Sequence, residues 1–179
     1  MMRITTGLFR GHRLIENKFE HVRPTTDKVR QAIFTKLQFF VPEKRVLDLF
    51  CGTGAMGIEA LSRGAAKVVF VDKDIRSVQM TKQNLKNMKI DAKVNKCNAL
   101  TFLEECNEQF DLIILDPPYK SGLYEKVLQK IFEKQLLSDD GVIVCEHATG
   151  DNFDYSNFEV YDEKKYGNIT VTYLKKLKN

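Results

Sequence analysis

The segment best suited to chemistry in this sequence is Asp116-Pro117-Pro118-Tyr119. It directly follows an almost wholly apolar stretch, residues 110–115, which is typical of a buried strand. Ligands of open α/β sheets bind at the carboxyl ends of the strands, so we expect the segment at such an edge. An ionised aspartate only accepts hydrogen bonds, and prolines have carbonyls but no N–H. With the aromatic ring of the tyrosine, these groups predict a pocket that accepts hydrogen bonds from an NH₂ group on a planar ring.

A glycine-rich loop precedes this segment in the chain. Gly52, Gly54 and Gly57 form a G-x-G-x-x-G pattern directly after one predicted strand and before a predicted helix. Glycines allow a tight turn and a close approach of the backbone to a ligand. Asp72 ends the next predicted strand, 20 residues after Gly52, where a carboxylate can accept hydrogen bonds from ribose hydroxyls. The pattern therefore predicts a site for a cofactor that contains a nucleoside.

Asp48 helps to choose between the two cofactors that suit this loop, a nicotinamide dinucleotide and S-adenosyl-L-methionine. It lies just before the loop, near the expected central part of the cofactor. A carboxylate is repelled by a pyrophosphate and attracted by an ammonium group. Asp48 thus favours S-adenosyl-L-methionine, while the dinucleotide stays an alternative.

The elements expected to position these residues alternate regularly between residues 45 and 146. Apolar and β-branched runs predict strands, and apolar residues at helical spacing predict helices. Strands are expected at 45–50, 67–71, 92–95, 110–115 and 141–146, and helices at 55–63, 75–88, 99–106 and 123–137. This alternation predicts a mostly parallel sheet with helices on both faces.

The C-terminal part departs from the alternation. Residues 158–162 and 168–174 read as two strands, and no helix is expected between them. They predict an antiparallel hairpin at the end of the sheet. The fold class expected is therefore α/β, with a seven-stranded, mostly parallel sheet and an antiparallel C-terminal hairpin.

The N-terminal part is expected to lie outside this sheet. Residues 1–22, punctuated by glycines, predict a short β-hairpin arm, and residues 23–179 form the main domain. A helix is expected directly after Thr26, because threonine caps helix N-termini and Asp27 favours the first turn.

Charge is unevenly distributed along the chain of 179 residues, whose net charge is +4. Residues 1–30 carry seven basic and three acidic residues, and residues 163–179 carry five lysines and one glutamate. The residues between them carry 16 basic and 20 acidic ones. Basic ends of this kind suit a polyanionic partner, and arginine suits phosphate in particular.

Composition excludes several classes of protein. The chain is 43% hydrophobic and 29% charged, which is ordinary for a globular protein and unlike a disordered or fibrous one. No apolar stretch is long enough to span a bilayer, and no export signal is visible. The four cysteines lack the spacing of zinc ligands, so we expect reduced thiols, no metal site and a cytoplasmic protein.

Together these motifs resemble the class I S-adenosylmethionine-dependent methyltransferases of the RsmD type, which are bacterial guanine-N2 methyltransferases of small-subunit (16S) ribosomal RNA. The resemblance covers nearly the whole chain. It is carried by Arg3-Ile4 with Gly7 and Gly11, Arg23-Pro24-Thr25 with Asp27, Val29 and Arg30, Asp48 to Gly54, Gly57 to Ala60, Asp116 to Tyr119, and Tyr166-Gly167-Asn168. The D-P-P-Y segment is shared with DNA adenine methyltransferases, whereas the arm and the R-P-T-x-D segment indicate the RNA family.

The resemblance implies a Rossmann-like fold and methyl transfer to the exocyclic N2 of a guanine, during assembly of the small ribosomal subunit. The implied catalytic set is Asp116, Pro117, Pro118 and Tyr119, and the implied cofactor-binding set is Asp48, Phe50, Gly52, Gly54, Asp72, Asn98 and Ala99. The family commonly carries Asp where Asn98 stands, to accept from the adenine amino group, and an asparagine carbonyl oxygen can also accept. The candidate RNA phosphate contacts are Arg3, Arg10, Arg13, Arg23, Lys28 and Arg30. We expect a monomer.

Three alternatives remain open from the sequence. Methylation of adenine N6 in DNA uses the same chemistry, but such enzymes usually need a target-recognition domain, and this chain has only short segments outside its core. A NAD-dependent oxidoreductase accounts for the glycine loop and leaves the D-P-P-Y segment unexplained. A non-catalytic RNA binder in ribosome assembly accounts for the basic arm and leaves the intact Asp48 and Asp116 unexplained.

Overall fold

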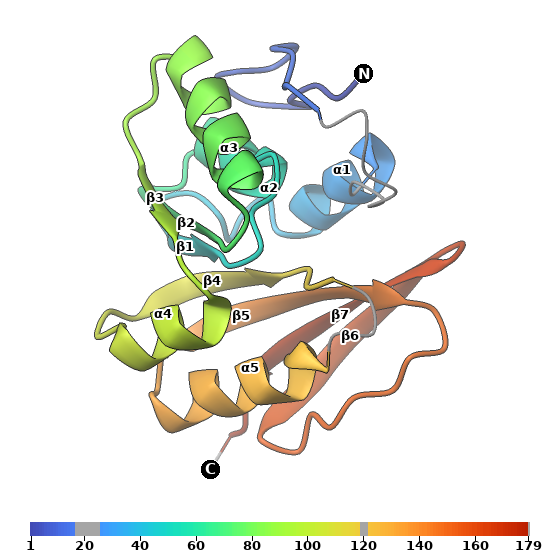
Figure 1. Ribbon diagram of the computed structural model, residues 1–179. Helices are drawn as coiled ribbons and strands as arrows, with labels where there is room; N and C mark the ends of the chain where they lie inside the picture. The colour runs from blue at the N-terminus through green and yellow to red at the C-terminus, as the bar shows by residue number, and fades with distance from the viewer. Residues whose placement is uncertain (17–25, 119–121, 179) are drawn as a thin grey trace.

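A computed structural model describes residues 1–16, 26–118 and 122–178 of the chain. Its centre is a seven-stranded sheet with strand order β3-β2-β1-β4-β5-β7-β6 (Figure 1). The strands are β1 (Arg45–Asp48), β2 (Lys67–Asp72), β3 (Lys93–Lys96), β4 (Phe110–Leu115), β5 (Leu137–Ala148), β6 (Phe158–Tyr166) and β7 (Ile169–Lys176). The helices are α1 (Asp27–Lys36), α2 (Ala55–Ser62), α3 (Ile75–Asn87), α4 (Ala99–Glu105) and α5 (Leu123–Glu133).

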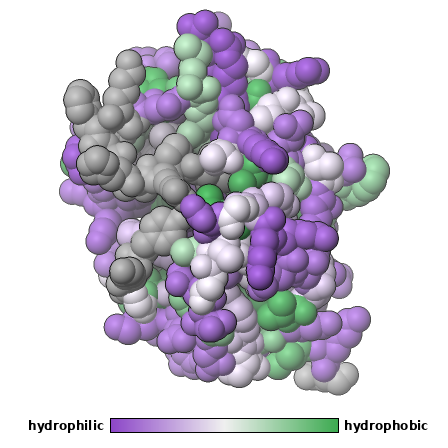
Figure 2. Space-filling view, turned by 90° about the vertical axis from the view of Figure 1, so that its right-hand side faces the viewer, coloured by the Kyte–Doolittle hydropathy of each residue, from purple (hydrophilic) through white to green (hydrophobic). Residues whose placement is uncertain are grey.

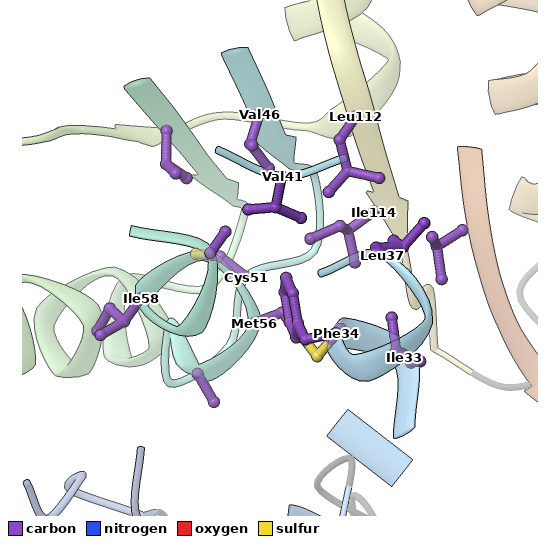
Figure 3. Packing of buried hydrophobic residues seen from close by; sticks show 14 of the residues in the cluster. Ile33, Phe34, Leu37, Val41, Val46, Cys51, Met56, Ile58, Leu112 and Ile114 are labelled. Carbon is purple, nitrogen blue, oxygen red and sulfur yellow. The ribbon is translucent and has the colours of Figure 1, made fainter. Parts of the chain in front are cut away.

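Helices cover both faces of the sheet, as the alternation predicts. Figure 1 shows α1, α2 and α3 on one side and α4 and α5 on the other. Each side has its own apolar cluster. On the first side, Phe34 of α1 and Met56 of α2 pack toward Ile114 of β4 (Figure 3). On the second side, Leu128 of α5 packs with Ile113 of the same strand. Burial of both faces explains why β4 is almost wholly apolar.

The strand order reverses beside β1, and this reversal positions the site. β1 pairs in parallel with β2 on one side and with β4 on the other. The chain therefore leaves the carboxyl ends of β1 and β4 in divergent directions, and ligands of open α/β sheets bind at such a reversal. The glycine loop follows β1 directly, and Asp116 follows β4 directly.

The C-terminal hairpin is confirmed, and its strands are longer than predicted. β7 lies between β5 and β6 and is antiparallel to both, so β6 forms the edge of the sheet. Only Gly167 and Asn168 separate the two strands, and Gly167 has φ of +63°, a conformation that glycine adopts without strain. The sequence prediction left residues 164–167 between the two strands, whereas β6 continues to Tyr166.

The N-terminal arm doubles back as predicted, with one antiparallel bridge between Arg3 and Arg13 in place of two extended strands. Its apolar side chains Met2, Ile4 and Leu14 are buried in the first cluster. Gly7 lies so close to α2 that a Cβ there would stand 1.9 Å from the carbonyl oxygen of Ser62. The arm is therefore packed against the sheet domain. The division into residues 1–22 and 23–179 stays a prediction, because residues 17–25 lie outside the described part.

Helix α1 begins where the sequence predicts. Thr26 is its N-cap, and the Thr26 hydroxyl accepts a hydrogen bond from the backbone N–H of Val29 at 3.2 Å. Within the described ranges, no helix is long and apolar enough to cross a bilayer.

Candidate functional site

The three glycines of the loop have different structural roles. Gly52 and Gly54 have φ of +54° and +83°, which side chains other than glycine rarely adopt. No atom lies within 4 Å of the position that a Cβ on Gly52 would take, so the loop is open there. Gly57 lies inside α2, where a Cβ would stand 2.3 Å from the ring of Phe70. The first two glycines thus shape the turn, and the third lets the helix approach the sheet.

Asp72 fixes the conformation of this loop. One oxygen of its carboxylate accepts a hydrogen bond from the backbone N–H of Gly52 at 2.9 Å. The other accepts from the N–H of Asp74, also at 2.9 Å. Because each carboxylate oxygen can accept more than one hydrogen bond, the half-buried side chain keeps capacity for a ligand hydroxyl.

Asp48 is buried beneath the same loop, with 2% of its surface exposed. Its carboxylate accepts a hydrogen bond from the backbone N–H of Gly57 at 3.0 Å. Burial raises the pKa of Asp48 to about 7; the hydrogen bond from Gly57 opposes this shift, and the negative charge of Asp72 adds to it. A cation bound beside Asp48 favours the ionised form, so the site is suited to a positively charged group.

The next predicted contacts follow β3 and β1. Asn98 is the exposed N-cap of α4, and its carbonyl oxygen accepts from the backbone N–H of Leu100 at 3.0 Å. That oxygen has a second lone pair, so it can still accept from a ligand amino group. Ala99 is buried, and Phe50 is half-buried against the second cluster. Among the described residues, no three His, Cys, Asp or Glu side chains are grouped to hold a metal ion.

The D-P-P-Y segment begins directly after β4, the strand next to β1. Asp116 is half-buried, Pro117 is buried and Pro118 is exposed, while Tyr119 lies outside the described residues. Asp48 pairs with Ile114 in the sheet register, so Asp116 lies just beyond the level at which β1 ends. The segment and the glycine loop therefore share one edge of the sheet.

Tyr124, at the start of α5, connects two strand ends at this edge, and it lies on the second side of the sheet. Its buried hydroxyl donates to the carbonyl oxygen of Leu115 at 3.1 Å and also contacts the carbonyl oxygen of Glu146. The ends of β4 and β5 are thereby held together. Burial raises the pKa of Tyr124 well above its usual value, so the hydroxyl keeps its proton.

The candidate RNA contacts fall into three groups. Arg3, Arg10, Arg13 and Lys28 are exposed. Arg23 lies outside the described residues. Arg30 is wrong as a phosphate contact, because its side chain is fully buried.

Arg30 belongs instead to a buried ionic cluster between the arm, α1 and α2. Its guanidinium lies 2.9 Å from the carboxylate of Asp27 and 3.6 Å from that of Glu59. Glu59 is also fully buried, pairs with Arg63 at 3.2 Å and accepts from the backbone N–H of Thr5 at 3.0 Å. Composition does not distinguish the basic residues of the arm and α1 from one another, so no pattern in the sequence indicates that Arg30 is buried in an ion pair.

Asn84 on α3 links the arm to the glycine loop and was missed by the sequence analysis. Its carbonyl oxygen accepts from the backbone N–H of Ile15 at 2.7 Å, and its amide donates to the carbonyl oxygen of Thr53 at 2.8 Å. The side chain is fully buried. The feature of the sequence that could have identified Asn84 is its polar side chain on the apolar face of the predicted helix.

Hydrophilic residues dominate the side on which the candidate site lies. Figure 2 views the side toward which β4 and β5 run in Figure 1. Its described part is mostly hydrophilic, and apolar residues form small, separate areas. Such a surface suits a polar partner better than an apolar one.

The chain matches the family model described as Conserved hypothetical protein 95 over residues 2–175. It is 32% identical to the ribosomal RNA small subunit methyltransferase D of Escherichia coli, over 94% of this chain and 86% of that protein. It is 35% identical to the protein of the same name from Haemophilus influenzae, over 81% of this chain and 78% of that protein.

Solved structures agree with this match. The yhhF protein of Escherichia coli superposes with a TM-score of 0.88 at 30% identity, over 98% of this chain and 97% of that one. The Thermus thermophilus 16S rRNA N2 G1207 methyltransferase, solved with AdoMet and guanosine, has a TM-score of 0.73 at 21% identity, over 89% of this chain and 45% of that one. The latter shows the fold, which is that of the class I methyltransferases.

Proposed function

Because the chain belongs to the Conserved hypothetical protein 95 family, together with the ribosomal RNA small subunit methyltransferases D, we propose that it transfers a methyl group from S-adenosyl-L-methionine to the exocyclic N2 of a guanine in small-subunit ribosomal RNA. The observation that carries this proposal is the edge of the sheet at which β1 and β4 end side by side. There a glycine loop above a buried carboxylate lies beside an acceptor-only Asp-Pro segment.

The residues at or just after the ends of β1, β2 and β3 fit S-adenosyl-L-methionine. When bound, the cofactor supplies a methyl group activated by its positively charged sulfonium. Asp48 would attract the ammonium group, since ionisation of its buried carboxyl is favoured by a neighbouring cation. Asp72 would accept from ribose hydroxyls, and Asn98 would accept from the adenine amino group.

The residues after β4 fit the amino group of a base. The exocyclic nitrogen of guanine is a poor nucleophile, because its lone pair is delocalised into the ring. The Asp116 carboxylate and the carbonyl of Pro117 or Pro118 would accept its two hydrogens, which favours a pyramidal nitrogen with its lone pair directed at the methyl group. Positioning of this kind can contribute about 7–11 kcal/mol when the attack geometry is good.

Two further requirements are the release of a proton from the methylated nitrogen and the binding of the ring of the base. The methylated nitrogen carries one hydrogen too many and must release a proton, which the Asp116 carboxylate can accept or pass to water. Tyr119 would stack on the base. Because RNA bases are usually read in single-stranded regions, a guanine in a loop costs less to present than one in a helix.

The exposed basic residues of the arm and α1 would bind the RNA backbone. Arg3, Arg10, Arg13 and Lys28 are accessible to phosphates, and Arg23 is proposed from the sequence. We further propose that the substrate is the small subunit or one of its assembly intermediates, that the enzyme is monomeric, and that it acts in the cytoplasm, where ribosomes form.

A cellular experiment tests the proposal. The gene is deleted in its host, and small-subunit RNA is mapped by mass spectrometry of nuclease fragments. We expect one guanine to lose a single methyl group at N2, and expression of the wild-type protein to restore it. Expression of Asp116→Asn should not restore it. An unchanged set of RNA methyl groups in the deletion strain would contradict the proposed function.

A further inference from the structure

The turn between β6 and β7 lies at the same edge of the sheet as the candidate site, and the proposed transfer gives it no role. β5 runs toward that edge in parallel with β4, and β7 is antiparallel to β5, so β6 ends and β7 begins there. Residues 164–168, with the sequence Lys-Lys-Tyr-Gly-Asn, form the hairpin tip. Figure 1 shows this tip extending past the ends of β4 and β5.

The sheet register places the hairpin tip relative to Asp116. β5 pairs with β4 as far as Cys145, and it pairs with β7 as far as Ala148. Tyr166 lies at the level of Ala148, because both pair with the first residue of β7. Asp116 lies one residue beyond the level of Cys145, so at about 3.3 Å per residue Tyr166 stands about 7 Å farther out. Two strands separate β4 from β6, which gives a sideways distance of about 14 Å.

The hairpin tip is connected to the chain that leaves β5. The backbone N–H of Thr149 donates to the carbonyl oxygen of Asn168 at 2.9 Å, and the Thr149 hydroxyl donates to that of Gly167 at 3.1 Å. Tyr166 is half-buried and packs against the first apolar cluster. These contacts fix the position of the turn, so a partner can bind there at a lower cost in conformational entropy.

The two lysines of the hairpin tip are exposed and lie on opposite sides of the sheet. Lys164 pairs with Val171, which is buried in the first cluster, so Lys164 lies on the α1 side. Lys165 pairs with Thr170, and the alternation of the strand places it on the other side. The tip therefore presents positive charge on both sides of the sheet edge.

The charge of these lysines is not neutralised within the described part of the chain. The preceding acidic residues of β6 have other partners. Asp162 pairs with Lys36 of α1, and the carboxylate of Glu163 accepts from a hydroxyl on β7 at 3.0 Å. Neither Lys164 nor Lys165 forms an ion pair with another described residue. Both ammonium groups are therefore available to phosphates.

The hairpin tip and the N-terminal arm lie on opposite sides of the D-P-P-Y segment along the sheet edge. The arm lies on the β1 side, since Asn84 bonds both Ile15 of the arm and Thr53 of the glycine loop. The tip lies beyond β5, and Asp116 follows β4 between the two. An RNA strand that is bound by the arm and crosses Asp116 therefore continues toward the hairpin tip.

We propose that the hairpin tip is a second RNA-binding element, in which Lys164 and Lys165 bind phosphates of nucleotides next to the target guanine. The proposal rests on the proposed function and adds a binding surface for the same substrate. Phosphate contacts position a nucleic acid without taking part in the chemistry at the base. Loss of the two lysines should therefore weaken substrate binding and leave the transfer step unchanged.

The test measures methyl transfer to small subunits from the deletion strain by a double variant, Lys164→Gln with Lys165→Gln. KM for the subunits should rise on the order of tenfold, and the slope of log kcat/KM against log salt should fall by about one to two. kcat and the affinity for S-adenosyl-L-methionine should stay within about twofold of wild type. Wild-type kinetics in the double variant would overturn the inference. No transfer by the wild-type protein would instead contradict the proposed function.

The matched control is Lys82→Gln with Lys86→Gln, which removes the same charge from the surface of α3. Both lysines are exposed, and α3 leads away from the site edge after β2. This double variant should keep a KM close to that of wild type. Equal losses in the two double variants would overturn the inference, because general attraction between protein and RNA would then explain both.

A second measurement locates the contact on the RNA. Iron–EDTA is attached to the cysteine introduced by Lys165→Cys, and the hydroxyl radicals that it releases cut nearby RNA. Wild-type protein carried through the same labelling corrects for the native cysteines. The cuts should fall within a few nucleotides of the methylated guanine. Cuts confined to distant segments would overturn the inference. Loss of transfer in the Gln variant without any cuts near the guanine would also overturn it and would assign the tip to a protein partner.

Discussion

The carboxylate of Asp48 and the backbone N–H of Gly57 are joined by a 3.0 Å hydrogen bond in the interior of the protein. The bond ties the end of β1 to the first turns of α2, across the glycine loop. The N–H of Gly57 stabilises the ionised form of the Asp48 carboxyl, whereas burial disfavours that form. Asp48 therefore makes a structural contact, and its protonation state depends strongly on the charge of a group that binds next to it.

The first prediction concerns the pH dependence of cofactor binding. With a pKa of about 7, Asp48 in the free protein is mostly protonated below that pH and must lose its proton when an ammonium group binds. The affinity for S-adenosyl-L-methionine should therefore rise up to about tenfold per pH unit between about pH 5.5 and 7. Calorimetric titrations across this range measure it.

The control for this prediction is Asp48→Asn, which cannot ionise. Its affinity should be weaker, and the rise with pH should disappear. The cofactor's own amino group keeps its proton in this range, because α-amino groups titrate near pH 7.7–8.0. If wild type and variant show the same pH profile, Asp48 does not face the ammonium group.

The second prediction concerns Asp116. Asp116→Asn exchanges a charged acceptor for a neutral amide, so kcat should fall on the order of 10²-fold or more. Affinity for S-adenosyl-L-methionine should stay within about threefold, since the cofactor residues are elsewhere. The matched control is Asp111→Asn on β4, the strand that precedes Asp116, where the carboxylate pairs with Arg45 at 3.0 Å. An equal loss of kcat in both variants would show that the effect is one of stability.

The third prediction concerns the buried ionic cluster. Glu59→Gln leaves the buried Arg30 without its interior carboxylate, so the free energy of unfolding should fall by about 3–5 kcal/mol. Arg30→Met replaces the guanidinium by an apolar chain and should cost less when Glu59→Gln is already present. Glu108→Gln removes an exposed pair with Lys67 and should cost no more than about 1 kcal/mol. Urea unfolding compares them, and similar costs for Glu59→Gln and Glu108→Gln would refute the assignment.

The fourth prediction separates the surface arginines from the buried one. Affinity for small-subunit RNA should fall with salt, and Arg10→Ala or Arg13→Ala should each reduce the slope of log K against log salt by about one. Arg30→Met should leave the slope unchanged, because its side chain is buried. Filter binding at several salt concentrations measures the slopes. A smaller slope in Arg30→Met alone would reverse the interpretation.

Local patterns predicted the architecture well, for clear physical reasons. Thr26 caps α1, and the apolar run before Asp116 forms β4, because capping and burial are short-range properties of the sequence. The role of Arg30 could not be predicted in the same way. It depends on which residues distant in sequence meet in the fold, in this case Glu59. The predicted strands of the C-terminal hairpin were too short, because charged residues obscure the alternation of apolar and polar side chains there.

The most direct test of the account is the identity of the methylated nucleoside. The purified protein is incubated with labelled S-adenosyl-L-methionine and, in separate reactions, small subunits from the deletion strain, the same RNA without proteins, and unmethylated duplex DNA. The products are digested and the labelled nucleoside is identified. We predict N2-methylguanosine from small subunits or their RNA, and none from the DNA. N6-methyladenine from the DNA, or no labelled nucleoside from any substrate, would contradict the account.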